Sequence, residues 1–471
     1  MKLTFIGAGG VRTPLVIQSI LDYQERLPLT QVCLMDIDAE RLDLMRLASK
    51  SRLASGANFK VEWTTDARQA IEGSDFIVFT FRVGLMESRV IDEQVPLKYG
   101  VLGQETTGPG GFAMAMRTIP VALDYVRLVR ELAPDAWLLI FSNPAGMVTE
   151  AITRVAGFER AVGICDNPAY MLRNAASFLG VKPHQLFPEY YGLNHLGWLR
   201  SIYLDGVDQV PEILRALKNA KLDWHGLPFN SELIEALGVI PNEYLYFFYY
   251  PRQSVENLLR AEQSRAQQIL PFNQELYASL RRIRDEEDAP HLVDAAYARY
   301  LGKRHGTYMT LETGEQPHTS REDAPAQPEA SDQISEAAEG YSAVALSIIE
   351  ALKGGQGALI LNVPNRGALN GMADDDVVEV TCYVGNGVIR PVAMGALPEH
   401  ALGLMKMIKA YERLTILAAV EGSYALAVKA LALHPLVPSY EAAKKILDDY
   451  ITQHGEHFPS LRYNQVVGSG I

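Results

Sequence analysis

The chain has 471 residues, which exceeds the length at which one hydrophobic core usually stops growing, so we expect two domains. Hydrophobic residues make up 48% and charged residues 21%, the composition of a globular protein rather than of a disordered, fibrous or membrane chain. The net charge of −13 argues against a broad basic surface for nucleic acid or an anionic membrane. An anionic substrate would therefore need a local cluster of cationic side chains.

Short apolar runs alternate with helical segments in the first third of the chain. The predicted strands are nearly continuous in apolar residues, as parallel strands covered on both faces require: Leu3–Ile6, Val32–Met35, Phe76–Phe81, Trp137–Phe141 and Ala161–Ile164. The predicted helices between them include Leu15–Tyr23, Ala39–Leu53 and Ile119–Leu132. This β-α-β alternation predicts an α/β domain with a Rossmann-type parallel sheet over residues 1–165.

From residue 166 the pattern changes to longer helices mixed with a few strands. The predicted helices include Tyr170–Leu179, Val255–Arg284 and Gly340–Leu352, and the predicted strands include Gly357–Val363 and Val377–Val384. We expect a second, α+β domain over residues 166–471. The segment Glu312–Glu339 is rich in acidic, proline, serine and glutamine residues and is predicted to be a mobile surface loop.

Cysteine usage and the N-terminus indicate a location in the cell. The three cysteines, Cys33, Cys165 and Cys382, do not suit a disulfide framework and favour a reducing compartment. The N-terminus leads directly into a predicted strand without the apolar stretch of a signal peptide. The sequence also lacks an apolar run of about eighteen residues, the length that is needed to span a bilayer. We therefore expect a soluble, cytoplasmic protein with no membrane or nucleic-acid partner.

A glycine loop follows the first predicted strand. Gly7, Gly9 and Gly10, followed by Val11 and Arg12, lie where a strand turns tightly into a helix whose N-terminal amides point at a pyrophosphate. Arg12 replaces the third glycine of the usual Gly-x-Gly-x-x-Gly pattern. Taken alone the motif is weak, because a glycine turn without a ligand looks the same.

An acidic residue ends the second predicted strand. The Asp36 carboxylate can accept hydrogen bonds from both ribose hydroxyls of an adenosine, and it would repel a 2′-phosphate. The alternative is a solvated Asp that begins the next helix. Because strand, glycine loop, helix, strand and acid occur in this order, we predict an NAD site.

Two later segments contain residue types that bind metals. Cys165 and Asp166 follow the last predicted parallel strand, at the edge where such sheets bind ligands, and Asn194 and His195 lie further on between glycines. A thiolate and an imidazole, with two substrate oxygens, could hold a divalent cation of the manganese-to-zinc type rather than magnesium. The alternative is a core cysteine and a structural histidine, the interpretation given to the other two cysteines.

Residues 241–250 read Pro-Asn-Glu-Tyr-Leu-Tyr-Phe-Phe-Tyr-Tyr. Such a run is usually a packed helix face or a wall that stacks on a sugar. A tyrosine near a metal ion or cation could instead have its pKa lowered from about 10 and act as a base. Tyr244, Tyr246 and Tyr249 are the candidates.

Several arginines lie near these segments, although most could be solvated surface charges: Arg12, Arg82, Arg89, Arg117 and Arg304. A few of them directed at one pocket would let an acidic protein select a phosphorylated substrate through charge-assisted hydrogen bonds.

In this order the motifs resemble glycoside hydrolase family four, the NAD- and metal-dependent glycosidases, and within it most of all the 6-phospho-β-glucosidases. The resemblance covers nearly the whole chain. Besides the segments above it includes Gly-Gln-Glu-Thr at 103–106, Ser-Asn-Pro-Ala at 142–145, Arg-His-Gly-Thr-Tyr at 304–308, Gly-Tyr-Ser-Ala-Val-Ala-Leu at 340–346 and Asn-Val at 362–363.

The resemblance implies a role for each candidate residue. Cys165 and His195 correspond to the ligands of a divalent metal, for which we expect manganese, and Tyr244 corresponds to the base. The positions that would bind substrate are Glu105, Asn143 and Asn194. Arg89 and Arg304 would bind the 6-phosphate. The implied substrate is a 6-phosphorylated disaccharide or glycoside, such as a phosphorylated cellobiose-type sugar, and we expect a homodimer or homotetramer.

The family's mechanism accounts for this set of groups. Hydride passes from carbon 3 of the sugar to NAD, and the resulting ketone acidifies the hydrogen on carbon 2. The base removes that proton while the metal stabilises the enolate. The leaving group departs from carbon 1, water adds and the hydride is returned, so that no net oxidation occurs.

One departure leaves the anomer open. Position 166 is Asp where many 6-phospho-β-glucosidases of the family carry Asn, and an Asp is more typical of the 6-phospho-α-glucosidases, where it serves as the acid. A 6-phospho-α-glucosidase is therefore an alternative. Two others are a malate- or lactate-type NAD dehydrogenase, whose C-terminal domain the predicted α+β domain resembles, and an NAD-sensing module without catalysis.

Overall fold

The computed structural model describes residues 1–219, 227–285, 290–305, 310–313 and 342–463. Within these ranges the N-terminal part contains six parallel strands: β1 Lys2–Ile6, β2 Gln31–Met35, β3 Lys60–Thr64, β4 Phe76–Phe79, β5 Trp137–Ile140 and β6 Ala161–Gly163. Their order across the sheet is β6-β5-β4-β1-β2-β3, which is the Rossmann arrangement. The predicted Rossmann-type sheet is therefore confirmed.

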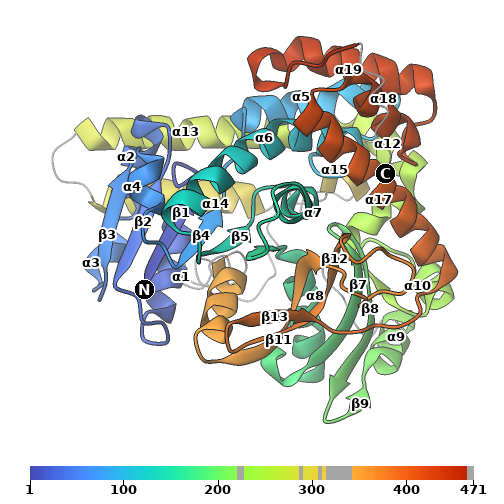
Figure 1. Ribbon diagram of the computed structural model, residues 1–471, viewed down its shortest axis with the longest axis horizontal. Helices are drawn as coiled ribbons and strands as arrows, with labels where there is room; N and C mark the ends of the chain where they lie inside the picture. Colours follow the sequence, from blue (N-terminus) through green and yellow to red (C-terminus); the bar gives the residue numbers. More distant parts are fainter. Residues whose placement is uncertain (220–226, 286–289, 306–309, 314–341, 464–471) are drawn as a thin grey trace, which may run out of the picture.

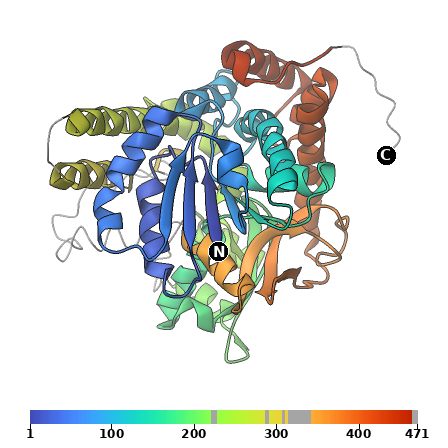
Figure 2. The same ribbon diagram turned by 60° about the vertical axis from the view of Figure 1, so that its left-hand side comes forward.

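Helices lie on both sides of the parallel strands (Figure 2). Their bounds are α1 Thr13–Tyr23, α2 Ala39–Ala48, α3 Lys50–Ala54, α4 Ala67–Ile71, α5 Leu85–Leu97, α6 Pro109–Leu132 and α7 Ala145–Glu150 with a π turn at Ala151–Val155. The next helix, α8 Asn167–Leu179, packs instead on the antiparallel strands that follow. Because both faces are covered, β1, β2, β4 and β5 are buried along almost their whole length.

Antiparallel strands extend the same sheet beyond β6 in the order β11-β12-β7-β8-β10. Their bounds are β7 Phe187–Leu193, β8 Leu196–Leu204, β9 Val207–Asp208, β10 Ile240–Pro241, β11 Gln356–Pro364, β12 Val377–Gly385 and β13 Val388–Pro391. The two parts meet where Asn362 of β11 pairs with Gly163 of β6. This junction places Asn362 and its β12 partner Glu379 beside the edge of the parallel strands.

The second part also contains helices, which confirms its predicted α+β character. Their bounds are α9 Val210–Lys218, α10 Ser231–Leu237, α11 Tyr246–Tyr249, α12 Pro251–Arg260, α13 Arg265–Asp285, α14 Pro290–His305, α15 Thr310–Thr313, a helix over 342–352, α17 Glu399–Glu421, α18 Tyr424–Leu433 and α19 Tyr440–His454, with 3₁₀ turns at Pro183–Gln185, Glu243–Leu245 and Gly455–His457. Helices α17 and α19 return to pack against α6 and α5 of the first part (Figure 1).

Two predicted helices are each divided in the structure. The expected helix Ala39–Leu53 is interrupted at Ser49, and the expected helix Val255–Arg284 is divided into α12 and α13. At the start of α13 the Ser264 amide donates to Gln267 Oε1 (2.8 Å), and the Gln267 amide donates to Ser264 Oγ (3.4 Å). This reciprocal pair is a capping box, so the sequence did contain the signal for a new helix.

Strand β3 was not predicted because it lies at the edge of the sheet and is only partly buried, without a continuous apolar run. The predicted helix Gly340–Leu352 is helical over 342–352. The predicted loop Glu312–Glu339 lies outside the described residues from position 314 onward.

A buried lysine links α17 to α7. Lys409 is 3% exposed, and its Nζ lies 2.6 Å from Glu150 Oε2 and 2.5 Å from Glu412 Oε2. It also donates to the Val377 carbonyl (2.7 Å). Lys409→Met would remove the nearest cation from two buried carboxylates and leave Glu150 with longer contacts to two arginines (3.5 and 3.8 Å). We therefore expect it to lower the free energy of unfolding by about 3 kcal/mol, the lower end for a broken buried pair.

Thermal or urea denaturation measures this loss, and Lys444→Met is the matched control. Lys444 forms an exposed pair with Asp448 one helical turn away on α19, so its replacement should leave the unfolding transition unchanged. Equal stability of the Lys409 variant and the wild type would show that the buried pairs contribute no net stability.

Candidate active site

Most of the predicted site residues follow the carboxyl ends of parallel strands. Gly7 follows β1, Asp36 follows β2, Arg82 follows β4, Asn143 follows β5 and Cys165 follows β6. Because the carboxyl ends of parallel strands share one edge, the sheet gathers residues from distant parts of the sequence along that edge.

The glycine loop packs so closely that two of its glycines have no room for a side chain. Gly7 has φ +106°, and a Cβ on it would lie 2.5 Å from the Phe81 amide nitrogen. A Cβ on Gly9 would lie 2.8 Å from the Asp36 carboxylate. Gly10, Val11 and Arg12 continue the loop into α1, which leaves the helix N-terminus in the place where a pyrophosphate would bind.

The loop and the acid at the end of β2 contact each other directly. Asp36 Oδ2 accepts a hydrogen bond from the Gly9 amide (2.7 Å), and Asp36 Oδ1 accepts one from the Asp38 amide (2.9 Å). A carboxylate has about four acceptor positions, so both oxygens can still accept the ribose hydroxyls of an adenosine. The side chain is partly exposed and therefore accessible to a ligand.

We expect Asp36→Ala to weaken NAD binding, because each charged hydrogen bond to ribose contributes about 1.5–3 kcal/mol before losses. Titration calorimetry with NAD measures the change. Asp43→Ala is the control, since Asp43 lies further along α2 and pairs with Arg46. Unchanged NAD affinity in the Asp36 variant would reject the assignment of the ribose site.

Cys165 and His195 are both buried, at 6% and 7% exposure. Burial raises the pKa of Cys165 well above its usual value, and the carboxylates of Glu379 and Asp166 raise it further. Burial lowers the pKa of His195 to about 4, although Asp166 and Glu105 oppose this shift. Asp166 thus acts on both residues, and the histidine is neutral, which is the form that binds a metal.

A tight turn presents His195. Strands β7 and β8 pair up to Leu193 and Leu196, so that Asn194 and His195 form the two-residue tip of the hairpin. His195 has φ +62°, a conformation that costs a residue other than glycine some energy and that is often retained at functional sites. Its ring stacks on the ring of Tyr244, with centroids 4.0 Å apart and planes at 10°.

The three candidate tyrosines have different surroundings. The ring of Tyr244 is the one that stacks on His195. Tyr249 accepts a hydrogen bond from Trp198 Nε1 (3.2 Å), and burial raises its pKa. Tyr246 is buried among aromatic rings, including those of Phe229 and Tyr250. The structure therefore stacks Tyr244 on His195, whereas Tyr246 and Tyr249 both lie near Phe229.

A buried carboxylate that the sequence analysis missed supports this hairpin tip. Glu379 of β12 accepts hydrogen bonds from Tyr190 Oη (3.0 Å), Asn194 Nδ2 (3.3 Å) and Asn362 Nδ2 (2.9 Å). Burial raises the pKa of Glu379 to about 7, although these hydrogen bonds favour the ionised form. Its position inside an apolar strand, Val-Val-Glu-Val, was the available signal.

Asn242 is a second buried polar residue that the sequence analysis missed. Its Nδ2 donates to Asn167 Oδ1 (2.5 Å) and to Tyr190 Oη (3.2 Å), and its Oδ1 accepts from the Tyr244 amide (3.0 Å). The side chain is fully buried. It therefore holds the turn that carries Tyr244 against the start of α8, which follows Cys165 and Asp166.

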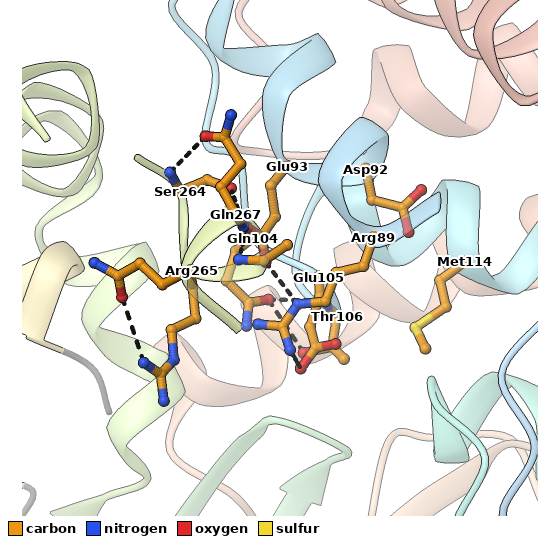
Figure 3. Close-up of polar contacts among 12 residues, drawn as sticks. Arg89, Asp92, Glu93, Gln104, Glu105, Thr106, Met114, Ser264, Arg265 and Gln267 are labelled. Atoms are coloured by element: carbon orange, nitrogen blue, oxygen red, sulfur yellow. Dashed lines mark hydrogen bonds and ion pairs between the residues drawn. The ribbon is translucent and has the colours of Figure 1, made fainter. Parts of the chain in front are cut away.

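A separate cluster of arginines surrounds Glu105. Arg89 Nη1 lies 3.1 Å from Glu105 Oε1 (Figure 3), and Arg82 Nη2 lies 2.8 Å from Glu105 Oε2. Burial alone would raise the pKa of Glu105, but Arg89, Arg82 and Arg304 together lower it to about 2. The structure thus brings Arg82, Arg89 and Arg304 close to Glu105.

The remaining candidates have clear positions. Asn143 is partly buried between β5 and α7. Arg117 is 2% exposed and forms a bidentate ion pair with Asp92 (2.7 and 2.6 Å), beside His454. It therefore joins α6 to α5 and α19 and is not a solvated surface charge. Cys33 and Cys382 are buried in β2 and β12, as expected.

The fold and these clusters define an enzyme with a dinucleotide-binding sheet and a second site at the sheet edge. Residues 2–181 match the model of the family 4 glycosyl hydrolases, and residues 190–437 match the model of that family's C-terminal domain. The chain belongs to family 4 of the glycosyl hydrolases, which confirms the predicted family.

Relatives of both anomeric types are similar to this chain. It is 32% identical over 478 residues to a probable 6-phospho-β-glucosidase of Bacillus subtilis (strain 168), with 99% of each chain covered. It is 31% identical over 479 residues to the phospho-α-glucosidase PagL of Clostridium acetobutylicum, with 98% of this chain and 99% of the relative covered.

Solved structures show the same two types. The 6-phospho-β-glucosidase of Thermotoga maritima, solved with NAD and glucose-6-phosphate, has a TM-score of 0.82 and 28% identity and covers 98% of this chain and 100% of its own. A 6-phospho-α-glucosidase from gut microorganisms, solved with NAD and Mn²⁺, has a TM-score of 0.81 and 26% identity and covers 98% and 99%. In the described part of this chain no helix is both long enough and apolar enough to cross a bilayer.

Proposed function

We propose that this chain hydrolyses 6-phospho-β-glucosides with the help of NAD and a divalent metal, manganese. The observation that carries the proposal is the arrangement at the sheet edge, where Tyr244 stacks on His195 and the Glu105–Arg89 pair lies near both His195 and Arg304. Such a site can hold a sugar and its phosphate at once. The β-type relatives and structures support this substrate class.

The residues present fit both cofactors. Side chains at Gly7 and Gly9 would fill the space in which the loop approaches Phe81 and Asp36, and the Asp36 oxygens suit the ribose of NAD. Cys165 and the neutral imidazole of His195 are the donor types that manganese-to-zinc ions accept. Bound NAD would supply a hydride acceptor, and the bound metal would supply a Lewis acid.

The chain's own residues would then carry out defined tasks. Arg89 and Arg304 bind the 6-phosphate, and Asn143 and Asn194 orient the sugar. Tyr244 accepts the proton from carbon 2. The ring stacking and the hydrogen bond that the Tyr244 backbone amide donates to Asn242 Oδ1 keep the phenol in place. Asp166, beside Cys165, would serve as the acid for the leaving group.

Hydrolysis of 6-phospho-α-glucosides is the second candidate function. The observation in its favour is Asp166, a carboxylate close enough to Cys165 and His195 to shift their pKa values. The phospho-α-glucosidase PagL is nearly as similar to this chain as the β-type relative. Membership of the glycosyl hydrolase family disfavours the malate-type dehydrogenase. The expected dimer or tetramer and the expected cytoplasmic location stay predictions.

The test is release of nitrophenol from the α- and β-nitrophenyl glucoside 6-phosphates, with NAD and Mn²⁺ present and NADH absorbance followed at the same time. We expect the β substrate to be preferred, activity to require NAD, and no NADH to accumulate. Preference for the α substrate would establish the second candidate, and NADH accumulating in proportion to turnover would indicate a dehydrogenase.

We expect removal of the metal by a chelator to abolish turnover and added Mn²⁺ to restore it. Cys165→Ser and His195→Ala should abolish turnover at every Mn²⁺ concentration, since a site with two protein ligands cannot lose one. Cys382→Ser is the matched control, because this buried cysteine lies in β12, where its thiol donates to the Val380 carbonyl. Full activity after chelation would overturn the metal site.

A further inference from the structure

Two tyrosines from helices α13 and α14 hold the glycine loop. Tyr277 Oη donates to the Gly9 carbonyl (2.9 Å), and Tyr297 Oη donates to the Val11 carbonyl (2.8 Å). Both side chains are buried, at 7% and 1% exposure. The Gly9 and Val11 carbonyls of the loop are thus held by residues more than 260 positions away in the sequence.

The same pair of helices reaches the arginine cluster. Arg304 lies two turns beyond Tyr297 on α14, and its Nη1 donates to Tyr300 Oη (2.8 Å). Arg265, the first residue of α13, donates from Nη2 to the Arg304 carbonyl (3.0 Å). The start of α13 and the end of α14 are therefore joined beside the proposed phosphate site.

A carboxylate connects α13 to the second arginine of that site (Figure 3). Glu93 Oε1 accepts from Arg89 Nε (2.7 Å), and Glu93 Oε2 accepts from the Ala266 amide in the first turn of α13 (2.8 Å). Both groups are buried. Arg89 and Arg304 are thus linked to one another through α13, although they lie on α5 and α14.

The contacts of α13 and α14 with the parallel-sheet domain are extensive enough to transmit a displacement. Tyr277 and Tyr297 belong to one buried apolar cluster with Val11 and Leu15 of the loop and α1. Arg41 lies 5.0 Å over the ring of Tyr277, and Arg281 forms an ion pair with Glu40 (2.7 Å). These contacts favour movement of the two helices together with the loop rather than independently of it.

Charge also connects the two sites. Burial lowers the pKa of Arg304, and the nearby cations Arg12 and Arg89 contribute to this shift. Arg12 replaces the third glycine of the loop. The cofactor loop itself therefore places a cation near Arg304 of the proposed phosphate site. An anion bound there would relieve the repulsion between the three guanidinium groups.

We propose that Tyr277 and Tyr297 are positioning residues through which α13 and α14 couple NAD binding at the glycine loop to 6-phosphate binding at Arg89 and Arg304. The inference rests on the proposed function for the two ligands. A phosphate held by Arg304 orders the end of α14, and Tyr297 transmits this order to the Val11 carbonyl. Each ligand therefore tightens the binding of the other, as linkage requires.

Calorimetry on the full chain tests the coupling. NAD is titrated with Mn²⁺ present, once without and once with saturating glucose 6-phosphate. We expect glucose 6-phosphate to tighten NAD binding by at least about 5-fold, the lower end of typical coupling between sites. In Tyr297→Phe and, separately, Tyr277→Phe, the ratio of the two dissociation constants should fall toward 1.

Tyr424→Phe is the matched control. Tyr424 is buried, and its Oη also makes a hydrogen bond, to Asp448 Oδ1 (2.7 Å), but between α18 and α19 and away from the loop and the arginines. The control should lose similar thermal stability and keep the wild-type ratio, which separates positioning from a general loss of stability. The two tyrosine variants test independent contacts, so failure of one to fold leaves the other decisive.

The outcomes are distinguishable. Binding of both ligands to the wild type without coupling would overturn the inference and leave the proposed function intact. A wild-type ratio in both tyrosine variants would also overturn it. Failure of the wild type to bind NAD or glucose 6-phosphate at all would overturn the proposed function, and the inference with it.

Discussion

Replacement of Tyr244 by phenylalanine is expected to lower kcat by about 10²- to 10⁴-fold, the usual contribution of a positioned acid or base. The phenylalanine ring keeps the stacking on His195, and the backbone amide keeps its hydrogen bond to Asn242, so the loss is confined to one hydroxyl. Affinity for NAD and for the metal should stay close to that of the wild type. Steady-state kinetics and calorimetry measure these quantities.

Turnover in deuterated water examines the same step directly. If Tyr244 takes the proton from carbon 2, the released sugar phosphate should carry deuterium at carbon 2. Tyr246→Phe is the control, because Tyr246 is packed against the rings of Phe247 and Tyr250 and a phenylalanine retains these contacts. Product without deuterium would count against proton abstraction from carbon 2, and a wild-type rate in Tyr244→Phe would move the base to another group.

Removal of the phosphate from the substrate should lower kcat/KM by about 10⁴-fold, the discrimination reached by sites built to bind a polar group. Arg304 is a partly buried cation beside Arg12 and Arg89, so a glycoside without the phosphate loses the charge-assisted hydrogen bonds that this cluster would donate. Paired assays on a nitrophenyl glucoside and its 6-phosphate measure the ratio.

Arg304→Met should reduce this preference for the phosphorylated substrate. Arg299→Met is the control on the same helix, since Arg299 is exposed. It should retain the wild-type ratio. Equal kcat/KM for the two wild-type substrates would remove Arg89 and Arg304 from the phosphate role.

Local patterns in the sequence determined the cofactor half of this protein. Apolar strands alternating with helices predicted the parallel sheet, and the Gly7–Arg12 loop with Asp36 predicted where a dinucleotide would bind. These features could be read because neighbours along the chain form them: a strand, its turn and the next helix. The same holds for Cys165 and Asp166, which follow a strand whose end lies at the ligand-binding edge.

The tertiary structure alone decided which distant residues support these groups. Glu379 reaches Asn194 because β12 lies beside β7, and Tyr277 reaches Gly9 because α13 packs on the first domain. The choice of Tyr244 among three tyrosines depended on the hairpin that presents His195. Such contacts depend on strand order, register and helix packing between segments far apart in the sequence, and the period of a local pattern contains no information about these pairings.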